Sequence, residues 1–252
     1  MPISAFQALR GAGHTSAVSK APTLLVAGAT GALGNAVLRR LLGTQRYGHA
    51  HVLAREPISM GMRSVQIVHM GGGISNWPLL QADTAVVMFD PPRMYYQRER
   101  ALFTPLLEQL PALASWLKAC GVRSLAIALP HAQGRLPEAI KRGLANLDEQ
   151  AVAALGFDLL LIVRSAQKPA ASPKRPAPQA LAHWMLSALQ FMVPSSEQPV
   201  RPAKIAEFVD IALQNLPKGS YVAAPELLWQ ASRGDTRAVV TQWVAGQTPA
   251  PA

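Results

Sequence analysis

The chain has 252 residues, half of them hydrophobic, with 24 Lys and Arg against 14 Asp and Glu. This length suits one α/β domain with a small additional lobe, and the apolar content is sufficient for a substantial core. No apolar run reaches the roughly 18 residues that a membrane span needs, so we expect no membrane partner. The formal charge of +10 is scattered along the chain and no nucleic-acid-binding motif accompanies it, so specific nucleic-acid binding is not expected.

The first 20 residues contain no acidic residue and are rich in Ser, Ala and Gly. They superficially resemble an organelle transit peptide but lack the apolar core of an export signal, and we interpret residues 1–20 as a disordered extension. Cys120 is the single cysteine, which excludes an internal disulfide and fits a reducing compartment. We therefore expect a cytoplasmic protein.

Residues 23–42, TLLVAGATGALGNAVLRRLL, predict a strand, a glycine-rich turn and an amphipathic helix. Gly28, Gly31 and Gly34 have the spacing G-x-x-G-x-x-G. The first two permit a sharp turn and a close approach to a pyrophosphate, and the third lets the helix pack against the sheet. The phosphates would lie on free N–H groups at the helix start. A valine in place of Gly31 is then expected to block them while the fold survives. The alternative is a tight turn that has lost its ligand.

Residues 49–55, HAHVLAR, predict a second strand that ends in Arg55. An acid at this position would bind the ribose 2′-hydroxyl of NAD, whereas a cation accommodates the 2′-phosphate, so Arg55 favours NADP over NAD. The alternative is an arginine at a solvated strand end. His49 and His51 share one face of this strand, but no third ligand follows at a suitable spacing, and no metal site is expected.

Further apolar runs predict strands over residues 65–68, 84–89, 124–129 and 157–163. The turn-rich GGGISNWP after the first of these runs indicates a loop or a shortened crossover helix. The second run continues into DPPRMYY, where prolines prevent further ladder bonds. We expect its carboxyl end, with Phe89, Asp90 and Pro91, to line the cofactor crevice.

Leucines at helical spacing predict a helix over residues 96–120 that Pro105 and Pro111 must interrupt or kink. A second helix is expected over residues 137–155, with Pro137 in its first turn. KPAASPKRPAP, at residues 168–178, has the composition of a linker. Beyond it we expect helices over residues 179–193 and 202–216 and a short strand over residues 221–224.

Four motifs together resemble the atypical short-chain dehydrogenase/reductase superfamily, particularly its NmrA-like members: VAGATGALG at residues 26–34, VLAR at 52–55, ACGVRSLAIAL at 119–129 and ALGFDLLLIVR at 154–164. The resemblance implies an α/β fold with a doubly wound parallel sheet, the Rossmann fold. It also implies an NADP site at Gly28, Thr30, Gly31, Ala32, Leu33, Gly34 and Arg55.

On this basis we divide the chain into four parts. Residues 1–20 form the extension, residues 21–168 the NAD(P)-binding Rossmann domain, and residues 169–178 a linker. Residues 179–252 form a small, mostly helical C-terminal lobe that packs on the Rossmann body and ends in a disordered tail.

The catalytic residues of the family do not carry over. Active members have a Ser at the end of the fifth strand and Tyr-x-x-x-Lys on the next helix, where the tyrosine acts as the acid. This strand ends in ALPHAQ, and alignment of the helix puts Lys141 at the tyrosine position and Ala145 at the lysine position. His131, Lys141 and Tyr95 remain as candidate catalytic groups, although surface placement or helix-start packing explains each equally well.

Two functions follow from these motifs. The missing Ser and Tyr favour a protein that binds NADP without turnover, as a redox sensor, regulator or assembly factor. The alternative is an NADP-dependent oxidoreductase of a small carbonyl or quinone substrate with an unusual proton donor. The expected partners are the dinucleotide and either a small-molecule substrate or another protein.

Overall fold

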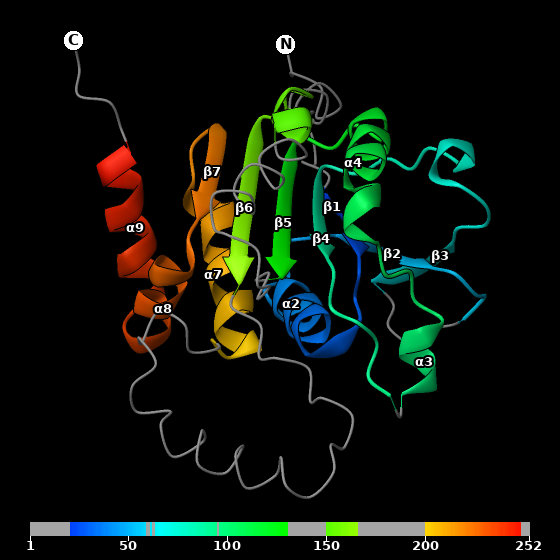
Figure 1. Cartoon of the computed structure of the whole chain (residues 1–252), viewed down its shortest axis with the longest axis horizontal. Coiled ribbons are helices and arrows are strands. Elements are labelled where there is room, and N and C mark those ends of the chain that lie inside the picture. The colour runs from blue at the N-terminus through cyan, green and yellow to red at the C-terminus, as the bar shows by residue number, and fades with distance from the viewer. Residues whose placement is uncertain are drawn as a thin grey trace, which may run out of the picture.

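The computed structural model of the chain describes residues 21–58, 61, 64–94, 96–130, 150–165 and 200–247. Within them, seven strands form one sheet in the order β3-β2-β1-β4-β5-β6-β7 (Figure 1). Every neighbouring pair is parallel. The chain runs outward from β1 to β3, returns to the centre and runs outward again from β4 to β7. This reversal defines a doubly wound sheet, so the predicted fold class is confirmed.

The strands are β1 (Thr23–Ala27), β2 (His49–Ala54), β3 (Val65–His69), β4 (Thr84–Met88), β5 (Ser124–Pro130), β6 (Leu159–Ser165) and β7 (Gly219–Ala223). The α-helices are α2 (Gly31–Gly43), α3 (Gln97–Arg100), α4 (Leu110–Ala119), α7 (Pro202–Asn215), α8 (Pro225–Arg233) and α9 (Thr236–Gln247). Two 3-10 turns, η1 (Ile74–Asn76) and η2 (Leu107–Gln109), complete the described elements.

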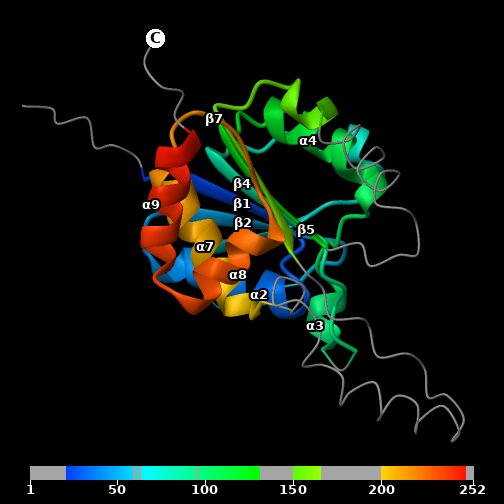
Figure 2. The same ribbon diagram turned by 60° about the vertical axis from the view of Figure 1, so that its left-hand side comes forward.

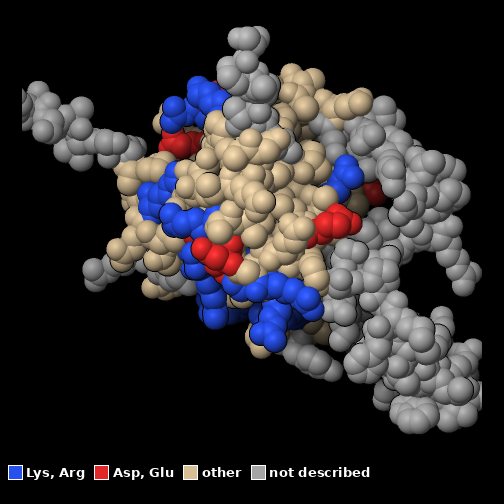
Figure 3. Space-filling view, turned by 90° about the vertical axis from the view of Figure 1, so that its left-hand side faces the viewer, with Lys and Arg blue, Asp and Glu red and all other residues tan. Residues whose placement is uncertain are grey.

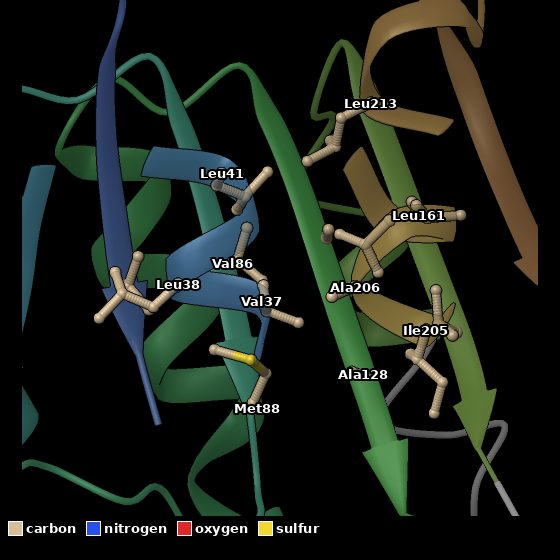
Figure 4. Close-up of a cluster of buried hydrophobic side chains, with 14 of the residues drawn as sticks. Val37, Leu38, Leu41, Val86, Met88, Ala128, Leu161, Ile205, Ala206 and Leu213 are labelled. Atoms are coloured by element: carbon tan, nitrogen blue, oxygen red, sulfur yellow. The ribbon is translucent and has the colours of Figure 1, made fainter. Parts of the chain in front are cut away.

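Helices α2, α7, α8 and α9 cover one face of the sheet, and α4 lies on the other (Figure 2). On the first face, Val37 and Leu41 of α2 and Phe208 of α7 are fully buried. Figure 4 shows α2 and α7 side chains, among them Val37 and Ile205, packed over β4, β5 and β6. The predicted apolar stripe of α2 therefore faces the core, as the 3.6-residue period requires.

On the opposite face, the described residues 70–83 that connect β3 to β4 contain no α-helix. Only η1 stands there, as the turn-rich sequence predicts. Aromatic rings fill the space instead: Trp77 meets Phe103 and Trp116 edge-on, with ring centroids 4.9 and 5.2 Å apart. Trp116 belongs to α4, so the rings join the apolar side of this helix, where Leu113 and Leu117 are fully buried.

The helix predicted over residues 96–120 is interrupted, as its prolines require. It consists of α3, an irregular stretch, η2 and α4, and Pro111 lies in the first turn of α4. The missing proline N–H costs nothing at that place, because first-turn N–H groups have no partner within a helix. Residues 101–104, in the irregular stretch between α3 and η2, return to the edge of the sheet.

The C-terminal part adds to the same sheet. Strand β7 pairs with β6, and α7 packs beside α2, where Arg40 Nε lies 2.8 Å from Asp210 Oδ2. Helix α7 and strand β7 agree with the predicted elements, whereas α8 and α9 were not among them. The predicted extension, the linker and the helix over residues 179–193 lie outside the described residues. Of the helix over residues 137–155, only residues 150–155 are described: residues 150–153 are helical, and residues 154 and 155 form a turn.

The surface carries charges of both signs. On the face formed by α8 and α9, Lys and Arg lie in separate groups around a wide uncharged centre, several with an acidic residue beside them (Figure 3). Lys204 pairs with Glu207 at 3.0 Å and Lys218 with Asp158 at 3.3 Å. None of the described helices has the length and apolar character needed to cross a bilayer.

Candidate functional site

The candidate site lies where the strand order reverses, at the carboxyl ends of β1 and β4. Folds of this class bind ligands in the crevice at that point. Gly28 follows β1, Arg55 follows β2, and Phe89, Asp90 and Pro91 follow β4. The N-terminus of α2 opens at the same edge, with Thr30 as its N-cap. The topology therefore brings together the main elements on which the predicted cofactor site depends.

The glycine turn has the predicted backbone conformation but a different close neighbour. Gly28 and Gly31 have φ values of +80° and +67°, which side-chain-bearing residues rarely adopt. A Cβ on Gly28 would lie 1.9 Å from the Met88 carbonyl oxygen, and one on Gly34 would lie 2.3 Å from the Gly28 carbonyl oxygen. The chain's own backbone therefore requires these glycines, whether or not a phosphate binds.

A valine at position 31 would strain the structure as well as block the predicted phosphate path. A Cβ on Gly31 would lie 2.8 Å from the Asp90 side chain and 2.8 Å from the Pro91 carbonyl oxygen, in addition to its positive φ. A branched side chain would push the β4–α3 connection away from the start of α2. The substitution would therefore disturb the packing together with any phosphate path.

Carboxylates of the chain occupy the start of α2. The Gly31 N–H donates to Glu99 Oε2 at 3.1 Å, and the Leu33 N–H donates to Asp90 Oδ2 at 2.9 Å. The buried Thr30 hydroxyl donates to the Asp90 carbonyl oxygen at 2.5 Å. These N–H groups point out of the first helical turn, where the helix dipole favours anions. The site thus binds anionic oxygen atoms, and in this conformation they belong to the protein.

Glu99 is 6% exposed and is held by Arg93. The Arg93 backbone N–H donates to Glu99 Oε2 at 3.0 Å, and the guanidinium donates to Oε1 through Nε at 2.8 Å and through Nη2. Burial alone would raise the pKa of Glu99, but the hydrogen bonds from Arg93 and Gly31 together outweigh it. The pKa of Glu99 is therefore lowered, and the side chain is a carboxylate at neutral pH.

Residues 101–104 cross the sheet edge between β1 and β2. The Arg55 N–H donates to the Ala101 carbonyl at 2.7 Å, Phe103 N–H donates to the Leu53 carbonyl at 2.9 Å, and Gly28 N–H donates to the Phe103 carbonyl at 3.0 Å. Ala54 and Leu102 form an isolated antiparallel bridge. The chain therefore covers the part of the edge that separates the glycine turn from Arg55.

The Arg55 side chain lies on this crossing segment. Its Nη2 donates to the Thr104 carbonyl at 2.9 Å, and its guanidinium carbon lies 5.7 Å from the centre of the Phe103 ring. Arg55 is exposed, so the cation predicted for a 2′-phosphate is held at the rim of the site and faces solvent.

The structure places the other predicted residues as follows. Ala32 is exposed on the first turn of α2, Leu33 is buried beneath it, and Phe89 is half-buried at the end of β4. The candidate catalytic residues His131, Lys141 and Tyr95 lie outside the described residues. Among the residues that are described, no cluster of three or more His, Cys, Asp or Glu could hold a metal ion.

Strand order and site together define the class: this is a Rossmann-fold protein. No family model matches the sequence, and a search of curated proteins finds no match. Among solved structures, a Rossmann-fold NAD(P)-binding family protein from Shigella flexneri is 16% identical, with a TM-score of 0.46 over 77% of this chain and 87% of that one.

Two further similar structures have named activities. The glucuronic acid dehydrogenase from Chromohalobacter salexigens is 14% identical, with a TM-score of 0.48 over 92% of this chain and 91% of that one. The triphenylmethane reductase of Citrobacter sp., solved with NADP(H), is 14% identical, with a TM-score of 0.44 over 90% and 92%. The Rossmann fold is assigned from the strand order of the chain itself.

Proposed function

We propose that this protein binds NADP at the carboxyl edge of β1, β2 and β4 and does not turn it over, acting as a redox sensor, regulator or assembly factor. The supporting observation is the start of α2, where the N–H groups of Gly31 and Leu33 hold anionic oxygens at 3.1 and 2.9 Å. The oxygens of a dinucleotide diphosphate have the same charge and hydrogen-bonding character as these carboxylates.

The choice of NADP over NAD rests on Arg55. Arg55, the residue directly after β2, is a cation with an exposed guanidinium. Residues 101–104 lie between it and the glycine turn and form backbone hydrogen bonds to both. A guanidinium forms charge-assisted, often bidentate bonds to phosphate, whereas an unmodified ribose hydroxyl offers no charge to it.

The non-catalytic role rests on the sequence after β5. Residues 131–156 contain neither Ser nor Tyr, so the acid of the short-chain dehydrogenase mechanism has no counterpart there. A positioned proton donor contributes about 10²- to 10⁴-fold to such a reaction. The second candidate, an NADP-dependent oxidoreductase, would have to draw its proton from His131, Tyr95 or water.

The first test is a titration of the full chain with NADPH and NADH. We expect NADPH to bind about tenfold or more tightly, and Arg55→Ala to remove most of that preference, since a charge-assisted bond is worth roughly 1.5–3 kcal/mol. Arg46→Ala removes the same charge from an exposed position before β2, at the opposite edge of the sheet, and should change neither affinity. Equal affinities of the wild type for the two cofactors would refute the NADP assignment.

An activity screen separates the two candidate functions. Wild-type protein with NADPH is assayed by absorbance against aldehydes, ketones and quinones, and we expect no turnover. Robust oxidation of NADPH would favour the oxidoreductase. Repeating any positive reaction with His131→Ala and Lys141→Ala would then show whether either residue supplies the proton.

A further inference from the structure

We infer that residues 90–94 and 96–104, the strap, close the crevice from within, and that cofactor binding displaces the carboxylates of Asp90 and Glu99 from the start of α2. The inference rests on the proposed function and concerns regulation of the same site. It makes the described conformation the closed state of a switch.

The first step is competition for donors. Each backbone N–H has one proton, and those of Gly31 and Leu33 already serve Glu99 Oε2 and Asp90 Oδ2. A diphosphate at the start of α2 needs the same donors. It would also meet two carboxylates at contact distance, where like charges repel strongly because little water separates them. Carboxylates and diphosphate therefore exclude one another.

The second step concerns Arg93, whose guanidinium holds Glu99 in place through Nε and Nη2. When Glu99 leaves the helix start, Arg93 loses this partner while it remains on the same connection as Asp90. A diphosphate oxygen offers the arginine a replacement of the same sign. Opening thus exchanges one ion pair for another, which lowers its cost.

The third step concerns which part of the strap moves. Leu102 and Phe103 are each 5% exposed and form backbone bonds to β2 and the glycine turn, so residues 101–104 are the fixed end. Met94 and Tyr96, by contrast, are 70% and 53% exposed. Side chains exposed to this degree bury little apolar surface, and such regions open at low cost. We assign the movement to residues 90–94 and 96–100, so that the Glu99 carboxylate moves away from the start of α2.

The consequence is a link between cofactor and surface. If only a fraction of the molecules has the strap open, the apparent affinity for NADP equals the affinity of the open state multiplied by that fraction. Conversely, bound NADP holds residues 90–94 and 96–100 in an arrangement that differs from that in the free protein. A partner that binds only one arrangement would distinguish NADP-bound from NADP-free protein, which is what a sensor requires.

The test compares three variants of the full chain by calorimetry with NADPH and with inorganic pyrophosphate. Glu99→Gln removes the competing charge, and Glu99→Asp keeps the charge on a side chain one methylene too short to hold the Gly31 N–H. We expect both to tighten binding of each ligand about tenfold. Glu108→Gln makes the same charge change at an exposed position on η2 and should leave both affinities unchanged.

A second readout needs no variant. Trypsin cleaves after arginine, and Arg98 and Arg100 lie in the part that moves. Saturating NADPH should accelerate cleavage there in the wild type several-fold, since the strap is then open.

Asp90→Asn, which neutralises the other carboxylate, replaces the Glu99 variants in the binding assay if these do not fold. It should likewise tighten binding of NADPH and pyrophosphate.

The outcomes separate the two proposals. Wild-type affinity for NADPH that all strap variants retain, together with unchanged cleavage, would overturn the strap and leave the proposed function standing. Tighter binding of pyrophosphate by the variants without any binding of NADPH would overturn the proposed function and leave standing only the competition between the carboxylates and a diphosphate. Failure of every variant to bind either ligand would overturn both.

Discussion

At the scale of single residues, the glycine turn is constrained by the fold itself. Gly28→Ala would put a methyl group 1.9 Å from the Met88 carbonyl oxygen at a φ of +80°. We expect it to lower the free energy of unfolding by about 3 kcal/mol, from strain and overpacking together. Urea denaturation measures the change. The control is Gly43→Ala at the end of α2, where a Cβ meets nothing within 4 Å. This substitution should leave stability unchanged or raise it slightly.

Glu99 carries a pH dependence whose sign follows from its lowered pKa. Above the ordinary carboxyl pKa of 4.5 the side chain is ionised in both folded and unfolded protein. In this range its bonds to Arg93 and Gly31 make their full contribution to the free energy of unfolding. As the pH falls through the lower, folded-state pKa, this contribution is lost. Wild type should therefore be more stable than Glu99→Gln at pH 7, and the difference should shrink below pH 4.5. A difference in unfolding free energy that stays constant from pH 7 to pH 3 would contradict this.

At the scale of elements, regular periodicity predicted most of the sheet. The strands come from apolar runs and α2 from a stripe of leucine and valine, because these patterns reflect burial on a fixed face. Helices α8 and α9 were missed. The signal for α8 was present in Pro225 at its start and Gly234 after its end. Helix α9, TRAVVTQWVAGQ, contains several β-branched residues, whose helix propensity is low, so its sequence did not indicate a helix.

The strap shows why the site could be predicted only in part. The glycine turn and Arg55 are local patterns, so the sequence pointed to them directly. The contact between Glu99 and Gly31 spans 68 positions of the chain and depends on how residues 101–104 return to the sheet edge. In the sequence, Glu99 is only one acid between two arginines on a short helix, and nothing local distinguishes it from a solvated residue.

At the scale of the whole molecule, one sheet unites both ends of the described chain. Strand β7 extends the Rossmann sheet beyond β6, and Arg40 of α2 pairs with Asp210 of α7, whose side chain is 2% exposed. The helix that presents the candidate phosphate site is therefore braced by the C-terminal part. A fixed α2 beside residues 90–94 and 96–100, where Met94 and Tyr96 are exposed, suits a switch in which the strap moves and the helix does not.

The most direct measurement is the backbone amide spectrum of the ¹⁵N-labelled full chain during titration with NADPH. The account predicts that Gly31, Ala32 and Leu33 shift together and saturate at one cofactor per chain, with changes at Arg93 and Glu99 following the same curve. Amides of β7 and α8, at the far edge of the sheet, should stay in place. Saturable binding that leaves Gly31 and Leu33 unshifted, or no binding at all, would contradict the claim that α2 receives the dinucleotide.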